Sequence, residues 1–142
     1  MGAVQVSGNS NSEVAKRFVG AWRYVGSTVD GKPLPGRGAN PKGLIHYDSS
    51  GYMSVQVAPD QERKKAGSTP TPEEAQAALV EYIAYFGTYT IDEQAATVTH
   101  HRQGSVQPGD VADVVRCYEF AGDRLTLRPP GTTHEIVWER IK

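Results

Sequence analysis

Short runs of β-forming residues, separated by turn residues, dominate the hydrophobic pattern of this chain. The runs lie at residues 22–28, 44–47, 52–57, 87–91, 97–102, 111–120, 125–127 and 135–141. Turn-forming residues lie between several neighbouring runs and predict β-hairpins there, as at Asp48-Ser49-Ser50-Gly51 and Gly122-Asp123. The prolines and glycines of residues 31–36 predict a loop. Strands joined mainly as antiparallel hairpins predict an all-β sandwich or barrel.

One helix is predicted to interrupt this series, between the third and fourth strands. Thr71-Pro72-Glu73-Glu74 is a capping box with proline at the first helical position. Apolar residues then recur at helical spacing, namely Ala75, Leu79, Tyr82, Ile83 and Phe86. Gly87 is predicted to end the helix, because glycine adopts the left-handed conformation easily. We expect the apolar stripe to pack against the sheet or across the mouth of a barrel.

The turn positions also predict which side chains point inward, because strand residues alternate between two faces. Around Gly122-Asp123, Tyr118 falls opposite Leu127. Around residues 92–95, Tyr89 falls opposite His100. In the first hairpin, Leu44, His46, Met53 and Val55 are predicted to share the inner face, with Ile45, Tyr47, Tyr52 and Ser54 on the other. The residues expected to line the interior and contact a ligand are Tyr24, His46, Met53, Val55, Tyr89, His100, Arg116, Tyr118 and Trp138.

Length, composition and charge limit the classes of function. A chain of 142 residues with 38% hydrophobic residues forms one domain with a real core. We expect a flexible tail at 1–12, with one helical turn at 12–18 leading into a domain at 13–142. A net charge of −1 argues against nucleic-acid binding, and no apolar run is long enough to span a membrane. The single cysteine, Cys117, and the polar N-terminus without a signal peptide favour the cytoplasm.

Several sequence segments resemble those of a family of small lipocalin-like domain proteins of bacteria and fungi, which have a calycin-type barrel. Gly20-Ala21-Trp22 and Arg140 match the lipocalin pattern of a Gly-x-Trp beneath an arginine from the last strand. Further matching segments extend the resemblance over residues 18–141; they lie at 18–23, 44–56, 82–90, 98–101 and 137–141. It implies an antiparallel, eight-stranded up-and-down barrel. The Thr-Asp-Tyr motif, disulfide pair and signal peptide of secreted lipocalins are missing, so the resemblance does not extend to an extracellular carrier.

Candidate chemistry is restricted to acid–base groups and hydrogen-bond donors. The sequence has no phosphate-binding glycine loop, no zinc motif and no Gly-x-Ser-x-Gly elbow. A metal site of His46, His100 and His134 is conceivable in a barrel, but we expect no metal and no cofactor. The candidate catalytic residues are His100 as a titrating base, Tyr89 and Tyr118 as proton donors, and Arg116 as a fork for a carboxylate or enolate.

Three hypotheses follow. The first is a barrel that binds a small, largely apolar organic molecule. The second is an isomerase, cyclase or hydrolyase that works without a cofactor on a natural product or aromatic catabolite; related lipocalin-like folds in biosynthetic pathways include such isomerases and cyclases. The third is an interaction module, with a homodimer formed through an exposed edge of the strand at 111–120. The sequence favours binding only slightly over catalysis.

Overall fold

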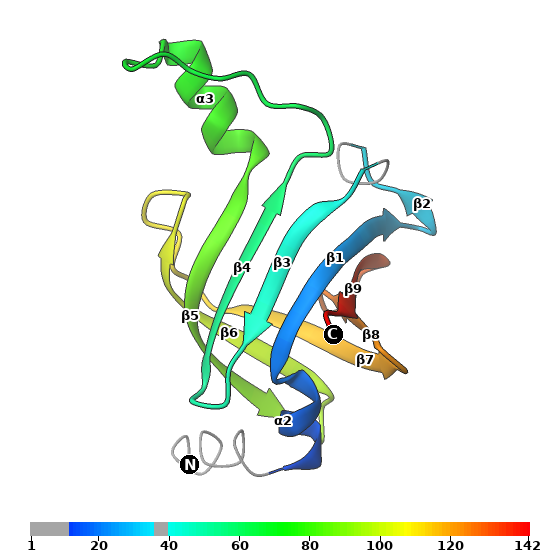
Figure 1. The fold of residues 1–142 in the computed structure, drawn as a ribbon. Helices are drawn as coiled ribbons and strands as arrows, with labels where there is room; N and C mark the ends of the chain where they lie inside the picture. Colours follow the sequence, from blue (N-terminus) through cyan, green and yellow to red (C-terminus); the bar gives the residue numbers. More distant parts are fainter. Residues whose placement is uncertain (1–11, 36–39) are drawn as a thin grey trace.

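A computed structural model describes residues 12–35 and 40–142, which form one closed antiparallel barrel (Figure 1). Its strands are β1 (Gly20–Val29), β3 (Lys42–Tyr47), β4 (Tyr52–Ala58), β5 (Ile83–Asp92), β6 (Thr97–Ser105), β7 (Val114–Ala121), β8 (Arg124–Arg128) and β9 (His134–Arg140). Neighbours in sequence pair as hairpins, and β1 pairs with both β3 and β9, which closes the barrel. The predicted eight-stranded up-and-down barrel is confirmed.

Period-two alternation explains why these segments form strands with one buried face. In β4, Met53, Val55 and Val57 are buried, while the residues between them are exposed. The register predicted around the later turns is confirmed, because Tyr89 pairs with His100 and Tyr118 pairs with Leu127. The core therefore lies inside the barrel, on the face that the apolar positions define.

One end of the barrel is closed by α2 (Glu13–Phe18) and the residues that follow it (Figure 1). Ser12 caps this helix, with its hydroxyl accepting a hydrogen bond from the Ala15 N–H at 2.9 Å. Phe18 is fully buried and lies edge-on against three aromatic rings, those of Tyr47, Tyr118 and Phe120. These four rings form an aromatic plug that obstructs the barrel at the α2 end.

The Gly-x-Trp segment at the closed end has a clear geometric basis. The guanidinium carbon of Arg140 lies 4.2 Å from the centre of the Trp22 ring, and Arg140 Nη1 donates to the Val19 carbonyl at 2.9 Å. The indole N–H of Trp22 donates to the Phe18 carbonyl at 2.9 Å. Gly20 has a φ of +133°, and a Cβ there would meet Arg140 Nη1 at 2.9 Å. Only glycine fits this position without strain.

The inserted helix, α3 (Pro72–Glu81), lies between β4 and β5, the third and fourth strands of the barrel. Its capping box is present as predicted, with Thr71 and Glu74 each bonding the other's backbone. Its predicted length and packing are wrong. Residues 83–92 form β5, which pairs with β4 from Val57↔Ile83 to Tyr52↔Thr88. Pairing on both edges of β5 outweighs the helical spacing of Ile83 and Phe86, so α3 buries no residue and projects from the barrel (Figure 1).

The predicted register of the first hairpin is also wrong. The structure pairs Tyr47 with Met53 and Ile45 with Val55, so these four share the inner face. Asp48 Oδ1 accepts from the Ser50 and Tyr52 N–H groups at 3.0 Å each, and Gly51 has a φ of +97°. The turn is therefore one residue longer than the predicted turn of Asp48-Ser49-Ser50-Gly51. A shift of one residue turns every side chain of β3 to the opposite face.

Three smaller differences concern element bounds and segments outside the described residues. Lys32–Pro33 forms a short strand, β2, on β1 within the predicted loop. The strand predicted at 111–120 begins at Val114, as β7, because residues 106–113 form the loop that precedes it. The predicted tail at 1–12 lies outside the described residues except for Ser12. None of the helices in the described ranges has the length and apolar composition that crossing a membrane requires.

Candidate functional site

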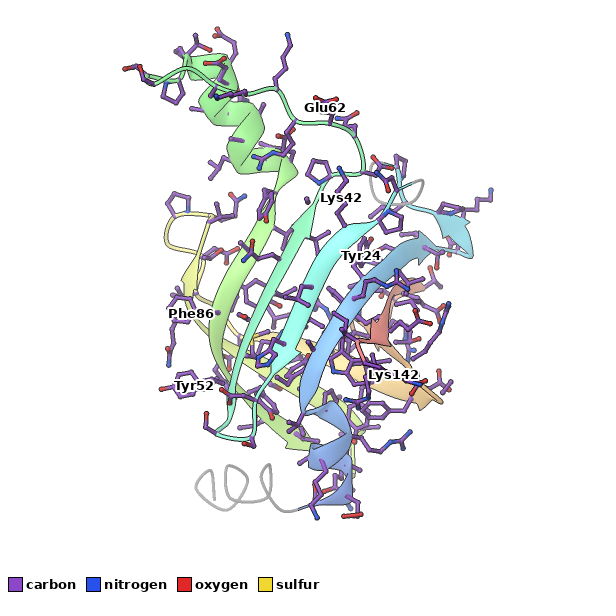
Figure 2. All side chains as sticks on the ribbon, in the orientation of Figure 1. Tyr24, Lys42, Tyr52, Glu62, Phe86 and Lys142 are labelled. Atoms are coloured by element: carbon purple, nitrogen blue, oxygen red, sulfur yellow. The ribbon has the colours of Figure 1, made fainter. Side chains whose placement is uncertain are left out.

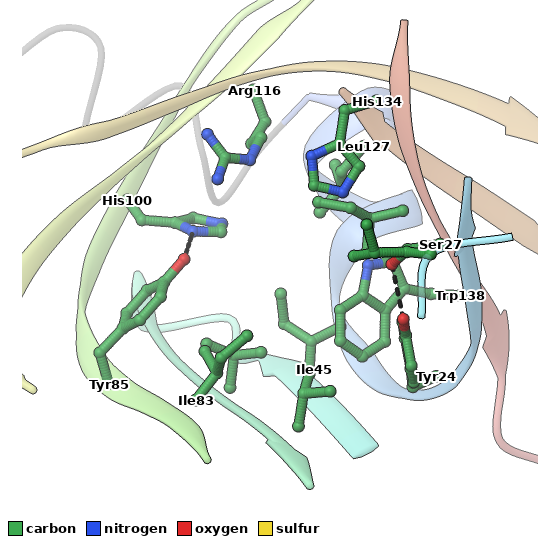
Figure 3. A pocket seen from close by; sticks show the side chains of 14 residues that line it. Tyr24, Ser27, Ile45, Ile83, Tyr85, His100, Arg116, Leu127, His134 and Trp138 are labelled. Atoms are coloured by element: carbon green, nitrogen blue, oxygen red, sulfur yellow. Dashed lines mark hydrogen bonds between the residues drawn. The ribbon is translucent and has the colours of Figure 1, made fainter. Parts of the chain in front are cut away.

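A cavity occupies the barrel at the end away from the aromatic plug (Figure 3). Its volume, taken as room for the centres of water molecules, is about 130 Å³. Apolar side chains from five strands and one loop form most of the wall, namely Leu34, Ile45, Val55, Val57, Ile83, Leu127, Ile136 and Trp138. Ile83 is 43% exposed, so it marks the side on which the cavity meets solvent. An engineered apolar cavity of roughly 150 Å³ binds benzene, so this volume suits one small organic molecule.

His100, on β6, is held between two tyrosine hydroxyls. Its Nε2 lies 2.6 Å from Tyr47 Oη, and its Nδ1 lies 2.7 Å from Tyr85 Oη. The imidazole is 1% exposed, and burial lowers the pKa of His100 to about 3, with the charge of Arg116 adding to the effect. His100 is therefore neutral at neutral pH, with one nitrogen donating and the other accepting.

Both tyrosines are protonated over the physiological range. Burial raises the pKa of Tyr85 to about 12 and holds the pKa of Tyr47 well above its usual range. Tyr85 lines the cavity and is partly exposed, whereas Tyr47 is fully buried toward the closed end. The hydrogen-bonded trio of Tyr47, His100 and Tyr85 therefore links the aromatic core to the cavity wall.

Arg116, on β7, places its guanidinium at the cavity wall (Figure 3). Its Nη1 donates to the Val115 carbonyl at 3.0 Å, and within the described ranges no carboxylate forms an ion pair with it. Arg102 on the neighbouring strand is different, because its Nη2 lies 2.6 Å from Asp110 Oδ1 and its Nε donates to the Ala112 carbonyl. The described wall of the cavity contains no acidic residue.

The opposite side of the cavity carries more polar groups. The hydroxyls of Tyr24 and Ser27 are 2.5 Å apart and buried. Two buried nitrogens, Trp138 Nε1 and His134 Nε2, find no hydrogen-bond partner in the described parts of the chain. Burial and the charge of Arg116 lower the pKa of His134, which favours its neutral form. Unpaired buried polar atoms are rare in proteins, so we expect a ligand or a solvent molecule to form hydrogen bonds with these two.

The structure brings together five of the residues predicted to contact a ligand: Tyr24, Val55, His100, Arg116 and Trp138 line the cavity. Their roles in binding or catalysis stay predictions.

The other four predicted contacts lie elsewhere. Met53 is buried in the core but is not part of the cavity wall. Tyr89 donates its hydroxyl to the Asp48 carbonyl at 2.7 Å, near the closed end, and Tyr118 packs against Phe18. His46 is exposed on the outer surface, because the first hairpin has the other register. The inward orientation predicted for His46 is therefore wrong, and His46, His100 and His134 do not converge on one metal ion.

Sequence reasoning missed Tyr47 and Tyr85 as site residues and considered His134 only as a metal ligand. The one-residue error in the predicted hairpin places Tyr47 on the outer face. The helical spacing of residues 75–86 places Tyr85 in the predicted helix. The alternation Ile83, Tyr85, Gly87, Tyr89 and Ile91 is a period-two signal that could have placed Tyr85 on the inner face.

Comparison with known proteins agrees with this architecture. The crystal structure of a DUF4847 family protein from Bacteroides vulgatus is similar in fold, with a TM-score of 0.53 and 14% sequence identity, covering 91% of this chain and 98% of that chain. A search among curated proteins gave no match. The model of a protein family described as "Lipocalin-like domain" matches residues 19–141 of this chain. The chain therefore belongs to the family of lipocalin-like domains.

Proposed function

We propose that the protein binds a small, largely apolar organic molecule in the barrel cavity. The carrying observation is a mainly apolar cavity with a few polar groups that converge on it, Tyr85, Arg116 and Trp138 among them. Apolar walls supply affinity through the hydrophobic effect, and a few fixed polar groups orient the ligand. Closure of the far end by the plug around Phe18 supports a cavity with one entrance rather than a channel.

The test is a fluorescence titration with 2-naphthalenemethanol, a neutral aromatic probe. The wild-type protein is expected to bind it saturably. Ile45→Phe adds a ring to the cavity wall and is expected to weaken binding at least tenfold, because the ring occupies part of the volume that the probe needs. Leu44→Phe is the matched control, since it adds the same ring to the adjacent residue, which is 43% exposed on the outer face.

Thermal unfolding keeps this test interpretable. Each variant is examined for a cooperative transition before titration, and Val57→Phe replaces Ile45→Phe if the latter does not fold. Probe at 100 times its Kd is expected to stabilise the wild-type fold by about 2.7 kcal/mol. Equal probe affinity of the two phenylalanine variants, or no binding by the wild type, would contradict the proposal.

A cofactor-independent enzyme stays an alternative prediction. The fate of a compound that co-purifies with the protein distinguishes such an enzyme from a binding protein. Native mass spectrometry of the purified protein gives the mass of any co-purified compound. A compound that leaves the protein with an altered mass or a changed isomeric form would replace simple binding by catalysis. In that case His100→Ala is expected to reduce turnover far more than affinity.

A further inference from the structure

The hydrogen bonds of Tyr47 determine how the protons of the neighbouring groups are arranged. Tyr47 is fully buried, and among the described residues its hydroxyl has one hydrogen-bond partner, His100 Nε2. If His100 carried its proton on Nε2, that nitrogen would donate to Tyr47 and leave the tyrosine proton buried without an acceptor. An unmade buried hydrogen bond is unfavourable. Tyr47 therefore donates to Nε2, and the proton of the neutral imidazole is on Nδ1.

This tautomer determines the orientation of the Tyr85 hydroxyl. His100 Nδ1–H donates to Tyr85 Oη across 2.7 Å, so the Tyr85 oxygen is the acceptor in that hydrogen bond. The hydroxyl proton of Tyr85 is then free to donate, and Tyr85 lines the cavity. Burial keeps the pKa of Tyr85 at about 12, so this proton is present at neutral pH.

Arg116 adds a positive charge on the same side of the cavity. Figure 3 shows Arg116, His100 and Tyr85 along one side, facing Tyr24 and Trp138. The charge of Arg116 acts on both tyrosine hydroxyls of the trio and on His100. No acidic residue occurs in the described cavity wall to neutralise it. A half-buried guanidinium without a carboxylate is unfavourable unless an anion or solvent accompanies it.

The opposite side of the cavity offers a further donor. Trp138 is 2% exposed, and its Nε1–H has no partner in the described chain. Indole nitrogen can only donate, as can a guanidinium. Tyr85, Arg116 and Trp138 thus offer donors to the cavity, while His134 Nε2 can also accept, depending on its tautomer. A wall with this many donors favours a ligand that carries acceptor atoms.

We propose that the ligand carries an anionic oxygen group, a carboxylate or an enolate, which binds to the Tyr85 hydroxyl and the Arg116 guanidinium while its apolar body fills the cavity. This inference rests on the proposed function and specifies its ligand class. Arg116 supplies the charge and the fork that matches two oxygens. The Tyr47–His100 pair positions Tyr85 as a donor, so Tyr47 and His100 are positioning residues.

The test compares two probes of the same shape, 2-naphthoate and neutral 2-naphthalenemethanol, by fluorescence titration at neutral pH. The wild-type protein is expected to bind 2-naphthoate about tenfold more tightly, as for a hydrogen bond to a charged group. Arg116→Met is expected to remove that preference, so that the variant binds the two probes with equal affinity. Tyr85→Phe, which retains the ring, is expected to reduce the preference several-fold. Arg124→Gln is the control, because it removes a positive charge from an exposed position on β8.

A second measurement tests the tautomer directly. The ¹⁵N chemical shifts of the His100 imidazole are expected to identify Nδ1 as protonated and Nε2 as an acceptor. Protonation at Nε2 would overturn the role of Tyr85. Equal affinity of the wild type for the two probes, or full retention of the preference in Arg116→Met, would overturn the anion proposal and leave the binding function intact. Failure of both probes to bind would overturn the binding function itself.

Discussion

At the scale of single residues, His100 illustrates how burial changes the chemistry that a sequence suggests. Histidine titrates near neutrality when unperturbed, which is why the sequence favours His100 as a base. In the barrel, both ring nitrogens bond tyrosine hydroxyls and burial lowers the pKa to about 3. Neither nitrogen has a lone pair or proton free for a substrate in this arrangement. The imidazole is suited to fixing the direction of hydrogen bonds.

This low pKa predicts a specific pH dependence of stability. The unfolded chain takes up a proton at His100 near pH 6.5, whereas the folded chain does so only near pH 3. Between these values the unfolded state binds more protons, so the free energy of unfolding falls as the pH is lowered. One proton corresponds to about 1.4 kcal/mol per pH unit.

Urea titrations at pH 6.5 and 4.5 measure this effect. His100→Gln is expected to show a smaller loss of stability over this range than the wild type. His101→Gln is the control, because His101 lies on the other face of the same strand, partly exposed, beside Asp113. If His100→Gln does not fold, a wild-type NMR titration showing His100 protonated at pH 5 would contradict the prediction.

At the scale of elements, the two helices have similar caps but different packing. Ser12 caps α2, whose Ala15 and Phe18 are fully buried. Thr71 caps α3, which buries no residue. A cap contributes about 1 kcal/mol to its helix, but it stabilises the whole fold only if the helix is coupled to the core by packing.

Removing each cap tests this difference. Ser12→Ala is expected to lower the global free energy of unfolding by about 1 kcal/mol. Thr71→Ala is expected to leave it nearly unchanged and to increase amide exchange within α3 alone. Urea unfolding followed by tryptophan fluorescence, together with hydrogen exchange, measures both effects. An equal global loss in the two variants would show that α3 packs on the barrel after all.

The same elements show how far sequence reasoning reaches. Alternation and turn residues predicted hairpin-joined strands in a sandwich or barrel and the pairings Tyr89↔His100 and Tyr118↔Leu127, because these depend on local patterns. The resemblance to lipocalin-like domains then implied the barrel. The face of β3 depended on one residue in the turn that Asp48 organises, and local propensity does not resolve a one-residue register. Residues 82–86 satisfy helical and strand spacing alike, and only pairing with β4 and β6 decides between them. The site inherited both errors, through Tyr47 and Tyr85.

At the scale of the whole molecule, the aromatic plug and the cavity lie at opposite ends of the barrel. Figure 2 shows side chains along the length of the barrel, with Tyr52 near the end that α2 closes and Glu62 near the opposite end. The closed end is packed by Phe18 and by the Trp22–Arg140 contact, which joins the first and last strands. The other end holds the cavity, whose wall includes Arg116 and Tyr85 and which is partly open to solvent. A change at the plug should therefore reduce stability without altering affinity.

Phe18→Leu tests this separation. The smaller side chain leaves the edge-on contacts with Tyr47 and Tyr118 unmade, and the free energy of unfolding is expected to fall by about 1–2 kcal/mol. The affinity for 2-naphthalenemethanol, measured well below the unfolding temperature, is expected to stay within about twofold of the wild type. Ile45→Phe gives the reverse pattern, because its new ring occupies the cavity. A tenfold loss of affinity in Phe18→Leu would mean that the plug determines the shape of the binding site, since the Tyr47–His100–Tyr85 trio connects the two ends.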